Sequence, residues 1–181
     1  MSNWNRVFKP ILVLCVICVV ITGALAATNA ATAPVIREAT IKAQNEARNE
    51  LLPEAEGAFS PVAGISVDNV DDVYAADNGA GYVITSTSKG YGGTMTVMVA
   101  FTPDSAIKQI KVTEQGETQG IGSKVAATPS YWERYVGQPA DGQLKITKDG
   151  GTIDGESGAT ISSRALAKAV SSAIEAYNAI P

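Results

Sequence analysis

The sequence predicts an α+β fold, in which an antiparallel sheet is packed with helices and is preceded by one N-terminal transmembrane helix. Three observations predict it: an apolar run near the N-terminus, a series of short β-branched segments separated by turn residues, and a helical apolar period near the C-terminus. The expected order is a cytoplasmic N-terminus over 1–9, a transmembrane helix over 10–33, an amphipathic helix and connecting loop over 34–72, and a folded domain over 73–181.

The apolar run is uncharged from Pro10 to Ala33. A membrane-spanning helix needs about 20 apolar residues, so the length suffices. Arg6 and Lys9 precede the run and the next basic residue is Arg37, which predicts a single pass through the cell (inner) membrane with the N-terminus cytoplasmic and the domain extracytoplasmic. A cleaved signal peptide is the alternative, because "GALAAT" offers an Ala-x-Ala-like site; it leaves the domain on the same side.

An amphipathic helix is expected after the membrane segment, between Pro34 and Pro53. Its small apolar residues recur every fourth position, as on one face of a helix: Ala39, Ala43, Ala47 and Leu51. A loop rich in Gly, Pro and Asp is predicted to follow, from Glu54 to Asp72.

Short strands are predicted next, and the first two flank the hairpin signal Asp77–Asn78–Gly79. The alternation of Thr and apolar residues from Thr94 onward indicates a strand with one wetter face. Strands are expected over 73–76, 82–88, 92–102, 106–115 and 142–151, with a glycine-rich loop over 116–123 and a short helix over 128–137. The last helix begins near Thr160 and places on one face Leu166, Val170, Ile174 and Tyr177.

Composition excludes several kinds of chemistry. The chain has no histidine, which removes histidine zinc sites and the Ser-His-Asp triad, and no metal site is expected. Its only cysteines, Cys15 and Cys18, lie in the apolar run, where they are interpreted as small apolar side chains. The formal charge of −4 argues against a nucleic-acid partner.

The stretch "ESGATISS" places a hydroxyl at the start of the last helix. A helix N-terminus has unpaired amide groups and a partial positive charge, which favour phosphate. Gly158 and Ala159 leave room for a phosphate to approach, and Thr160 presents its hydroxyl there. Alternatively, Ser157 or Thr160 caps the helix and Gly158 serves the turn. The residues alone leave both interpretations open.

Three stretches resemble the FMN-binding domain family, and the resemblance covers about Val73 to Tyr177. "DGESGAT", ending at Thr160, is similar to its flavinylation motif Asp-x-x-Ser/Thr-Gly-Ala-Thr. "ETQGIGSK" is similar to its flavin-side loop Glu-Thr-Pro-Gly-Leu-Gly, although Gln119 replaces the proline and Ile121 the leucine. "KGYGGTMTVMVAF" is similar to the Gly-Tyr-Gly start of a core strand in that family.

The resemblance implies that a flavin transferase joins the FMN phosphate to Thr160 as a covalent phosphoester. Tyr91, Tyr131 and Trp132 either stack on the flavin or belong to the core, and Lys124 is either a cation near the flavin or a solvated lysine. Asp154 either serves recognition by the transferase or forms the turn. The implied cofactor-binding residues are Thr160, Ser157, Gly158, Ala159, Ile161, Glu117, Thr118, Gly120, Ile121, Gly122, Lys124 and Tyr91.

Length and a single anchor are most similar, within that family, to the G subunit of Rnf electron-transport complexes. This resemblance implies an electron-carrier protein, without catalytic residues of its own, in a ferredoxin:NAD oxidoreductase coupled to Na⁺ or H⁺ translocation. Its partners would be the other membrane and peripheral subunits. The alternatives are a flavoprotein like the C subunit of a sodium-pumping NADH:quinone oxidoreductase, a stand-alone extracytoplasmic flavin carrier, and an exported binding module without cofactor.

Overall fold

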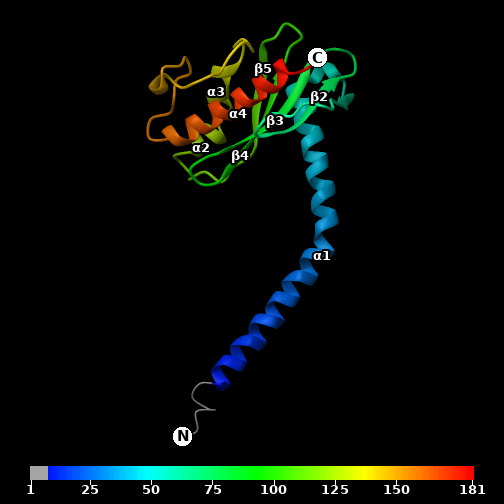
Figure 1. The fold of residues 1–181 in the computed structure, drawn as a ribbon, viewed down its shortest axis with the longest axis vertical. Coiled ribbons are helices and arrows are strands. Elements are labelled where there is room, and N and C mark those ends of the chain that lie inside the picture. The colour runs from blue at the N-terminus through cyan, green and yellow to red at the C-terminus, as the bar shows by residue number, and fades with distance from the viewer. Residues whose placement is uncertain (1–7) are drawn as a thin grey trace. The chain divides into compact units, whose positions relative to one another are not determined.

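A computed structural model describes residues 8–181 and divides the chain after Ala43 into two compact units (Figure 1). Helix α1 (Lys9–Leu51) begins in the first unit, and its last two turns, Gln44–Leu51, belong to the second. Arg6 and most of the expected cytoplasmic segment lie outside the described residues.

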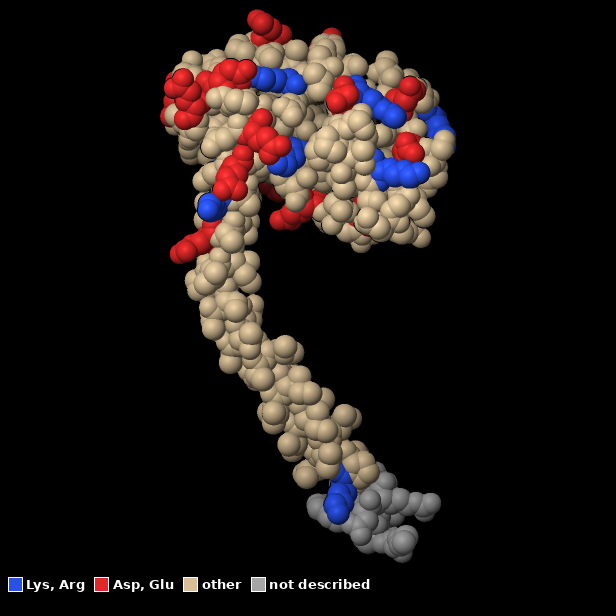
Figure 2. Space-filling model, turned by 180° about the vertical axis from the view of Figure 1, so that it is seen from behind, with Lys and Arg blue, Asp and Glu red and all other residues tan. Residues whose placement is uncertain are grey.

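The most apolar stretch of α1 has no buried residue, and α1 is, within residues 8–181, the one helix long and apolar enough to cross a membrane. Figure 2 shows this stretch as a continuous surface without charged side chains. Pro34 lies inside the helix, whereas a new helix was expected to begin there. Proline removes one backbone hydrogen bond, and here the turns on both sides keep the helix continuous.

The second unit is built on an antiparallel sheet in the order β1-β2-β3-β4-β5, which confirms the α+β class. Its strands are β1 (Phe59–Pro61), β2 (Val70–Ala76), β3 (Tyr82–Lys89), β4 (Thr94–Phe101) and β5 (Ile107–Glu114). The β2–β3 hairpin is confirmed, with Gly79 at φ 74° in its turn. The loop expected over 54–72 is partly wrong, because Phe59 to Pro61 form strand β1. This strand pairs with β2 on the side away from β3.

Helix α4 (Thr160–Asn178) covers one face of the sheet, as the apolar period predicted. Leu166, Val170 and Ile174 are buried there against strand residues such as Ile84 and Val99. The hydroxyl of Ser86 in β3 donates to the Ala169 carbonyl oxygen at 2.8 Å and thereby ties the helix to the sheet.

The opposite face of the sheet is covered by the end of α1 and by the short helix η2 (Pro53–Ala55). Leu51 and Leu52 are fully buried against Val83, Met98 and Ala100. The wetter face expected for β4 is therefore limited to its first residues, because the chain before the domain supplies the cover that the strand pattern alone does not reveal.

Between β5 and α4 the chain forms only short elements, α2 (Ser123–Ala126), α3 (Pro129–Trp132), η3 (Glu133–Tyr135) and η4 (Thr147–Asp149). The helix expected over 128–137 is confirmed as α3 and η3. The strand expected over 142–151 is wrong: a single bridge joins Ile146 to Ile153, and η4 lies between them. Gly150 has φ 79°, and a Cβ on Gly151 would lie 2.0 Å from the Lys145 carbonyl oxygen, so the chain turns back instead of extending.

Candidate functional site

A cavity of about 450 Å³ lies where three segments meet: the β3–β4 turn, the glycine-rich loop after β5, and the start of α4. Its volume falls in the range of about 300–1,000 Å³ that is typical of ligand pockets. The residues that line it are Tyr91, Glu117, Thr118, Ile121, Gly122, Gly158, Ala159, Thr160, Ile161 and Ser162.

Nine of the twelve cofactor-binding residues predicted from the sequence line this cavity. Ser157, Gly120 and Lys124 do not. The Lys124 ammonium lies 3.8 Å from the Glu156 carboxylate, and the Gly120 amide donates to the Ser123 hydroxyl at 2.8 Å. Three stretches of the chain, separated by tens of residues, therefore line the same cavity.

The rim of the cavity is apolar and exposed. Tyr91, Ile121 and Ile161 are 72%, 52% and 50% exposed. They are three of the four large apolar side chains that are exposed in the unit Gln44–Pro181. Apolar surface gathered in this way marks a place where a ligand or partner binds.

The other two aromatic candidates belong to the core. Tyr131 is buried, and its hydroxyl donates to the Asp154 carbonyl oxygen at 3.1 Å. Trp132 is half-buried and donates its indole N–H to the Val125 carbonyl oxygen at 2.8 Å. Of the three aromatic residues considered for stacking, only Tyr91 lies at the cavity.

The N-terminus of α4 is not capped by a side chain. Ala159 occupies the N-cap position, and neither Ser157 nor Thr160 makes the capping hydrogen bond that the alternative interpretation required. Within residues 8–181 the amide groups of Thr160, Ile161 and Ser162 have no acceptor. Gly158, at φ 83°, has open space where a Cβ would stand. This helix start is therefore free to bind an anion.

The Thr160 hydroxyl is half-buried and accepts a hydrogen bond from the Lys148 ammonium, with 3.1 Å between Nζ and Oγ1. Lys148 belongs to η4, in the segment predicted as a strand, and the sequence reasoning did not identify it. In the sequence Lys148 is only a basic residue upstream of the motif, and no spacing rule connects position 148 with position 160.

Glu117 is buried at the cavity wall, with 8% of its surface exposed. Its carboxylate accepts the Ser162 hydroxyl at 2.5 Å and the Gly92 amide at 3.2 Å. A Cβ on Gly90 or Gly122 would lie 2.1 Å or 2.3 Å from its oxygens. Glu117 therefore joins the three segments. Ser162, the second residue missed, carried one signal: a serine facing inward in the first turn of a helix.

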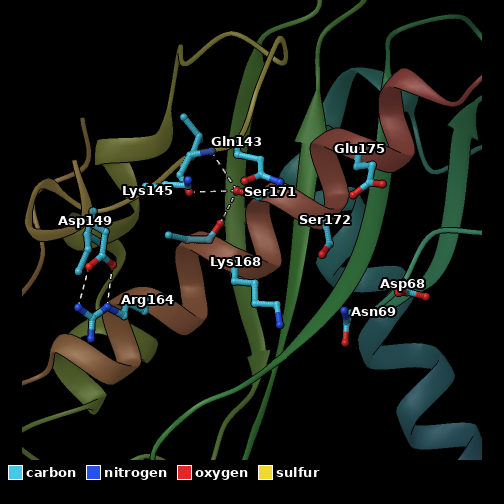
Figure 3. A pocket seen from close by; sticks show the side chains of 13 residues that line it. Asp68, Asn69, Gln143, Lys145, Asp149, Arg164, Lys168, Ser171, Ser172 and Glu175 are labelled. Atoms are coloured by element: carbon cyan, nitrogen blue, oxygen red, sulfur yellow. Dashed lines mark hydrogen bonds and ion pairs between the residues drawn. The ribbon is translucent and has the colours of Figure 1, made fainter. Parts of the chain in front are cut away.

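A larger cavity, of about 630 Å³, lies on the outer side of α4 (Figure 3). Its lining mixes basic and acidic side chains, including the ion pair of Asp149 with Arg164, and contains none of the predicted cofactor-binding residues. Because the free helix start, the apolar rim and the motif threonine all lie at the smaller cavity, that one is the candidate site.

Comparison with known proteins places these features in a family. The sequence model of the FMN-binding domain matches residues 90–175, and that of the RnfG N-terminal region matches residues 1–51. The solved structure of Shewanella oneidensis NqrC is 27% identical, covers 63% of this chain and 62% of its own, and superposes with a TM-score of 0.47.

Curated relatives match at nearly full length. The G subunit of the ion-translocating oxidoreductase complex of Methanosarcina acetivorans is 32% identical over 99% of this chain and 98% of its own. The G subunit of the proton-translocating ferredoxin:NAD(+) oxidoreductase complex of Clostridium ljungdahlii is 32% identical over 96% and 93%. The chain belongs to the G-subunit family of ion-translocating oxidoreductase complexes.

Proposed function

We propose that this protein is a membrane-anchored electron-transfer subunit that carries FMN covalently on Thr160, within a ferredoxin:NAD oxidoreductase complex that translocates Na⁺ or H⁺. The observation that carries the proposal is the Thr160 hydroxyl, which stands beside three amide groups without an acceptor and opens into a cavity with an apolar rim. Related G subunits support the proposal by their names. The one from Clostridium ljungdahlii is named for a proton-translocating ferredoxin:NAD(+) oxidoreductase complex, and the one from Acetobacterium woodii for a Na⁺-translocating complex of this kind.

The start of α4 suits a phosphoester. A phosphate bound through Thr160 keeps one negative charge, and the free amides of the first helical turn offer it hydrogen-bond donors within a positive dipole field. Gly158 presents no side chain that would block the phosphate oxygens. The same hydroxyl that anchors the phosphate therefore lies in the best local environment for its charge.

The rim suits a planar ring. Tyr91, Ile121 and Ile161 expose apolar surface around the cavity, and an isoalloxazine placed against them would remove that surface from water. The cavity is open, so one part of the ring would stay within reach of a partner protein. Electron transfer needs such access.

Bound FMN supplies the electron chemistry, and the chain holds and orients it. A covalent ester makes retention independent of affinity, which matters for a domain that faces unlimited dilution outside the cell. Glu117 places a carboxylate at the cavity wall, where it opposes a gain of negative charge by the bound group.

The proposed maturation requires a flavin transferase that recognises the motif, and we assign this contact to Asp154. Its backbone carbonyl is held by the Tyr131 hydroxyl and the Arg134 guanidinium. Its exposed carboxylate has no partner within residues 8–181 and is free to meet another protein.

The test is the mass of the full chain produced in membranes together with a flavin transferase. We expect an increase by FMN minus water and a flavin fluorescence band that survives denaturing electrophoresis. In Thr160→Ala both are lost while the circular dichroism of the domain is unchanged, because only a half-buried hydroxyl and methyl group are removed.

Thr118→Ala is the matched control, since Thr118 is the other threonine at the cavity. It should keep both the added mass and the band. A band that persists in Thr160→Ala would move the linkage elsewhere. A wild type without added mass under these conditions would favour the cofactor-free binding module.

A further inference from the structure

We propose that Lys148 binds the phosphate at Thr160 and orients the Thr160 hydroxyl for attachment. The inference rests on the proposed linkage at Thr160 and adds a residue that neither the motif nor the glycine-rich loop contains. Its basis is the contact of 3.1 Å between the Lys148 ammonium and Thr160 Oγ1.

The direction of this hydrogen bond matters. An ammonium group is a donor only, so the threonine oxygen accepts and its own O–H proton points elsewhere. The proton is then available to a base of the transferase, while a lone pair of the oxygen is held beside a positive charge. The positive charge favours loss of that proton, which makes the oxygen a stronger nucleophile.

Lys148 is held in place through its neighbour. The Asp149 carboxylate accepts two hydrogen bonds from Arg164 (Figure 3). The distances are 2.7 Å from Nε and 2.6 Å from Nη2. Arg164 lies four residues after Thr160, one turn along the same face of α4. Two consecutive residues of η4 therefore bind two residues one turn apart on α4.

The segment that carries Lys148 is anchored in the core at both of its ends. Ile146 is 1% exposed and pairs with Ile153, which is also buried. The close approach of Gly151 to the Lys145 carbonyl oxygen sharpens the reversal between them. Buried, paired residues therefore flank the segment that carries Lys148 on both sides.

The other lysines near the motif are placed differently. Lys124, the one that the resemblance suggested, lies against the Glu156 carboxylate. Lys145 lines the larger cavity on the outer side of α4. Within residues 8–181, Lys148 is the basic side chain in contact with the Thr160 hydroxyl.

Two acidic groups near Lys148 are already paired. The Asp149 charge is balanced by Arg164, and Glu117 faces the ring cavity with its carboxylate bound by Ser162. Neither carboxylate therefore competes with a phosphate for the Lys148 ammonium.

The attachment step conserves atoms and charge. Thr160 Oγ1 forms a bond to the flavin phosphorus, its proton passes to a base of the transferase, and the phosphorus loses its bond to a phosphate leaving group of an activated flavin dinucleotide. The Lys148 ammonium stabilises the negative charge that develops on the attacking and non-bridging oxygens. After the step it faces the anionic phosphodiester as a charge-assisted donor.

The experiment measures the initial rate of flavin attachment to the full chain in detergent, with purified transferase and flavin dinucleotide. Lys148→Gln should slow the rate by roughly tenfold, the size expected for loss of one charge-assisted hydrogen bond. Lys148→Arg keeps the charge and should recover most of the rate. Lys145→Gln is the matched control and should react like the wild type.

A second readout follows the finished ester. In ³¹P NMR of the modified protein, Lys148→Gln should shift the phosphodiester resonance and Lys145→Gln should leave it in place. A wild-type rate and resonance in Lys148→Gln would overturn the role of Lys148. Equal loss of rate in Lys148→Gln and Lys148→Arg would also overturn it, because charge would not be the cause. Flavin retained by Thr160→Ala would instead overturn the proposed linkage.

Discussion

Glu117 is the residue on which the candidate site is built. Burying a carboxylate is costly unless its oxygens are hydrogen-bonded, and here one oxygen accepts the Ser162 hydroxyl and the other the Gly92 amide. The carboxylate occupies the space that a Cβ on Gly90 or Gly122 would need. At the residue scale, the volume of one acidic side chain therefore explains these two glycines.

Gly122→Ala tests this explanation. The added Cβ would lie 2.3 Å from Glu117 Oε2 and 2.8 Å from Ser162 Oγ, so the wall of the cavity must shift. We expect a loss of about 1–3 kcal/mol in the free energy of unfolding, as for other overpacked sites. Chemical denaturation of the full chain in detergent measures it.

Gly142→Ala is the control, because a Cβ there has nothing within 4 Å and the residue has no positive φ. Its free energy of unfolding should stay close to that of the wild type. Equal stability of Gly122→Ala and the wild type would mean that the contacts around Glu117 relax without cost.

Between elements, the pair of Asp149 and Arg164 joins η4 to α4. The hydrogen bonds from Arg164 hold the pKa of the Asp149 carboxyl below its ordinary value. Because the folded-state pKa is lowered, the stability from this contact is complete above the ordinary carboxyl pKa of about 3.9 and is lost as the pH falls through the folded-state value.

Arg164→Gln should therefore raise the pKa of Asp149 towards the ordinary value. The measurement is an NMR titration of the Asp149 carboxyl carbon in the wild type and the variant. The difference in stability between the two proteins should be constant near neutral pH and vanish in acid. An unchanged Asp149 titration in Arg164→Gln would show that the contact is absent in solution.

The end of α1 meets the sheet through Arg48, which is 4% exposed. Its guanidinium lies 3.8 Å above the Tyr74 ring centroid and 3.7 Å from the Asp72 carboxylate, and it donates to the Asn45 side chain at 2.6 Å. A buried arginine with three kinds of partner fixes how the last turn of the helix lies on β2.

Arg48→Ala should reduce the free energy of unfolding by about 1–3 kcal/mol, since it removes a stacked and partly paired buried side chain. Lys108→Ala serves as the comparison because its ion pair with Glu54 is on the surface, where such pairs contribute little. Thermal unfolding, monitored by circular dichroism, compares the loss of stability in the two variants. A larger effect for Lys108→Ala would contradict this assignment.

At the scale of the whole molecule, the charges that flank the apolar run of α1 predict on which side of the membrane the domain lies. The uncharged run of α1 begins after Lys9, and the next basic residue is Arg37. The positive-inside tendency then predicts that the domain is outside, where the electron partners of an extracytoplasmic flavin would meet it.

Fusions to the C-terminus test the orientation. Alkaline phosphatase fused after Pro181 should be active and green fluorescent protein at the same position should not fluoresce, because each requires the opposite compartment. The mass of the purified chain also decides whether the apolar segment is retained or cleaved after the Ala-rich stretch. The reverse pattern of the two reporters would place the domain in the cytoplasm.

Local patterns were sufficient for much of the molecule. The apolar run, the hairpin at Asp77–Asn78–Gly79, the central strands and the amphipathic α4 are each specified by residues close together in the chain. The short motif around Thr160 also predicted the threonine at the cavity, because the start of a helix is a local feature. These predictions needed no knowledge of distant contacts.

Other features were decided only by tertiary structure. The burial of Met98 and Ala100 depends on the end of α1. The segment 142–151 forms a turn that packs against α4 instead of the expected strand. The contact of Lys148 with Thr160 likewise joins a turn and a helix that no sequence period relates. Sequence determined most of the elements and placed the Thr160 hydroxyl at the start of a helix. Packing decided that Lys148 lies beside that hydroxyl, because side-chain proximity is set by how the elements pack.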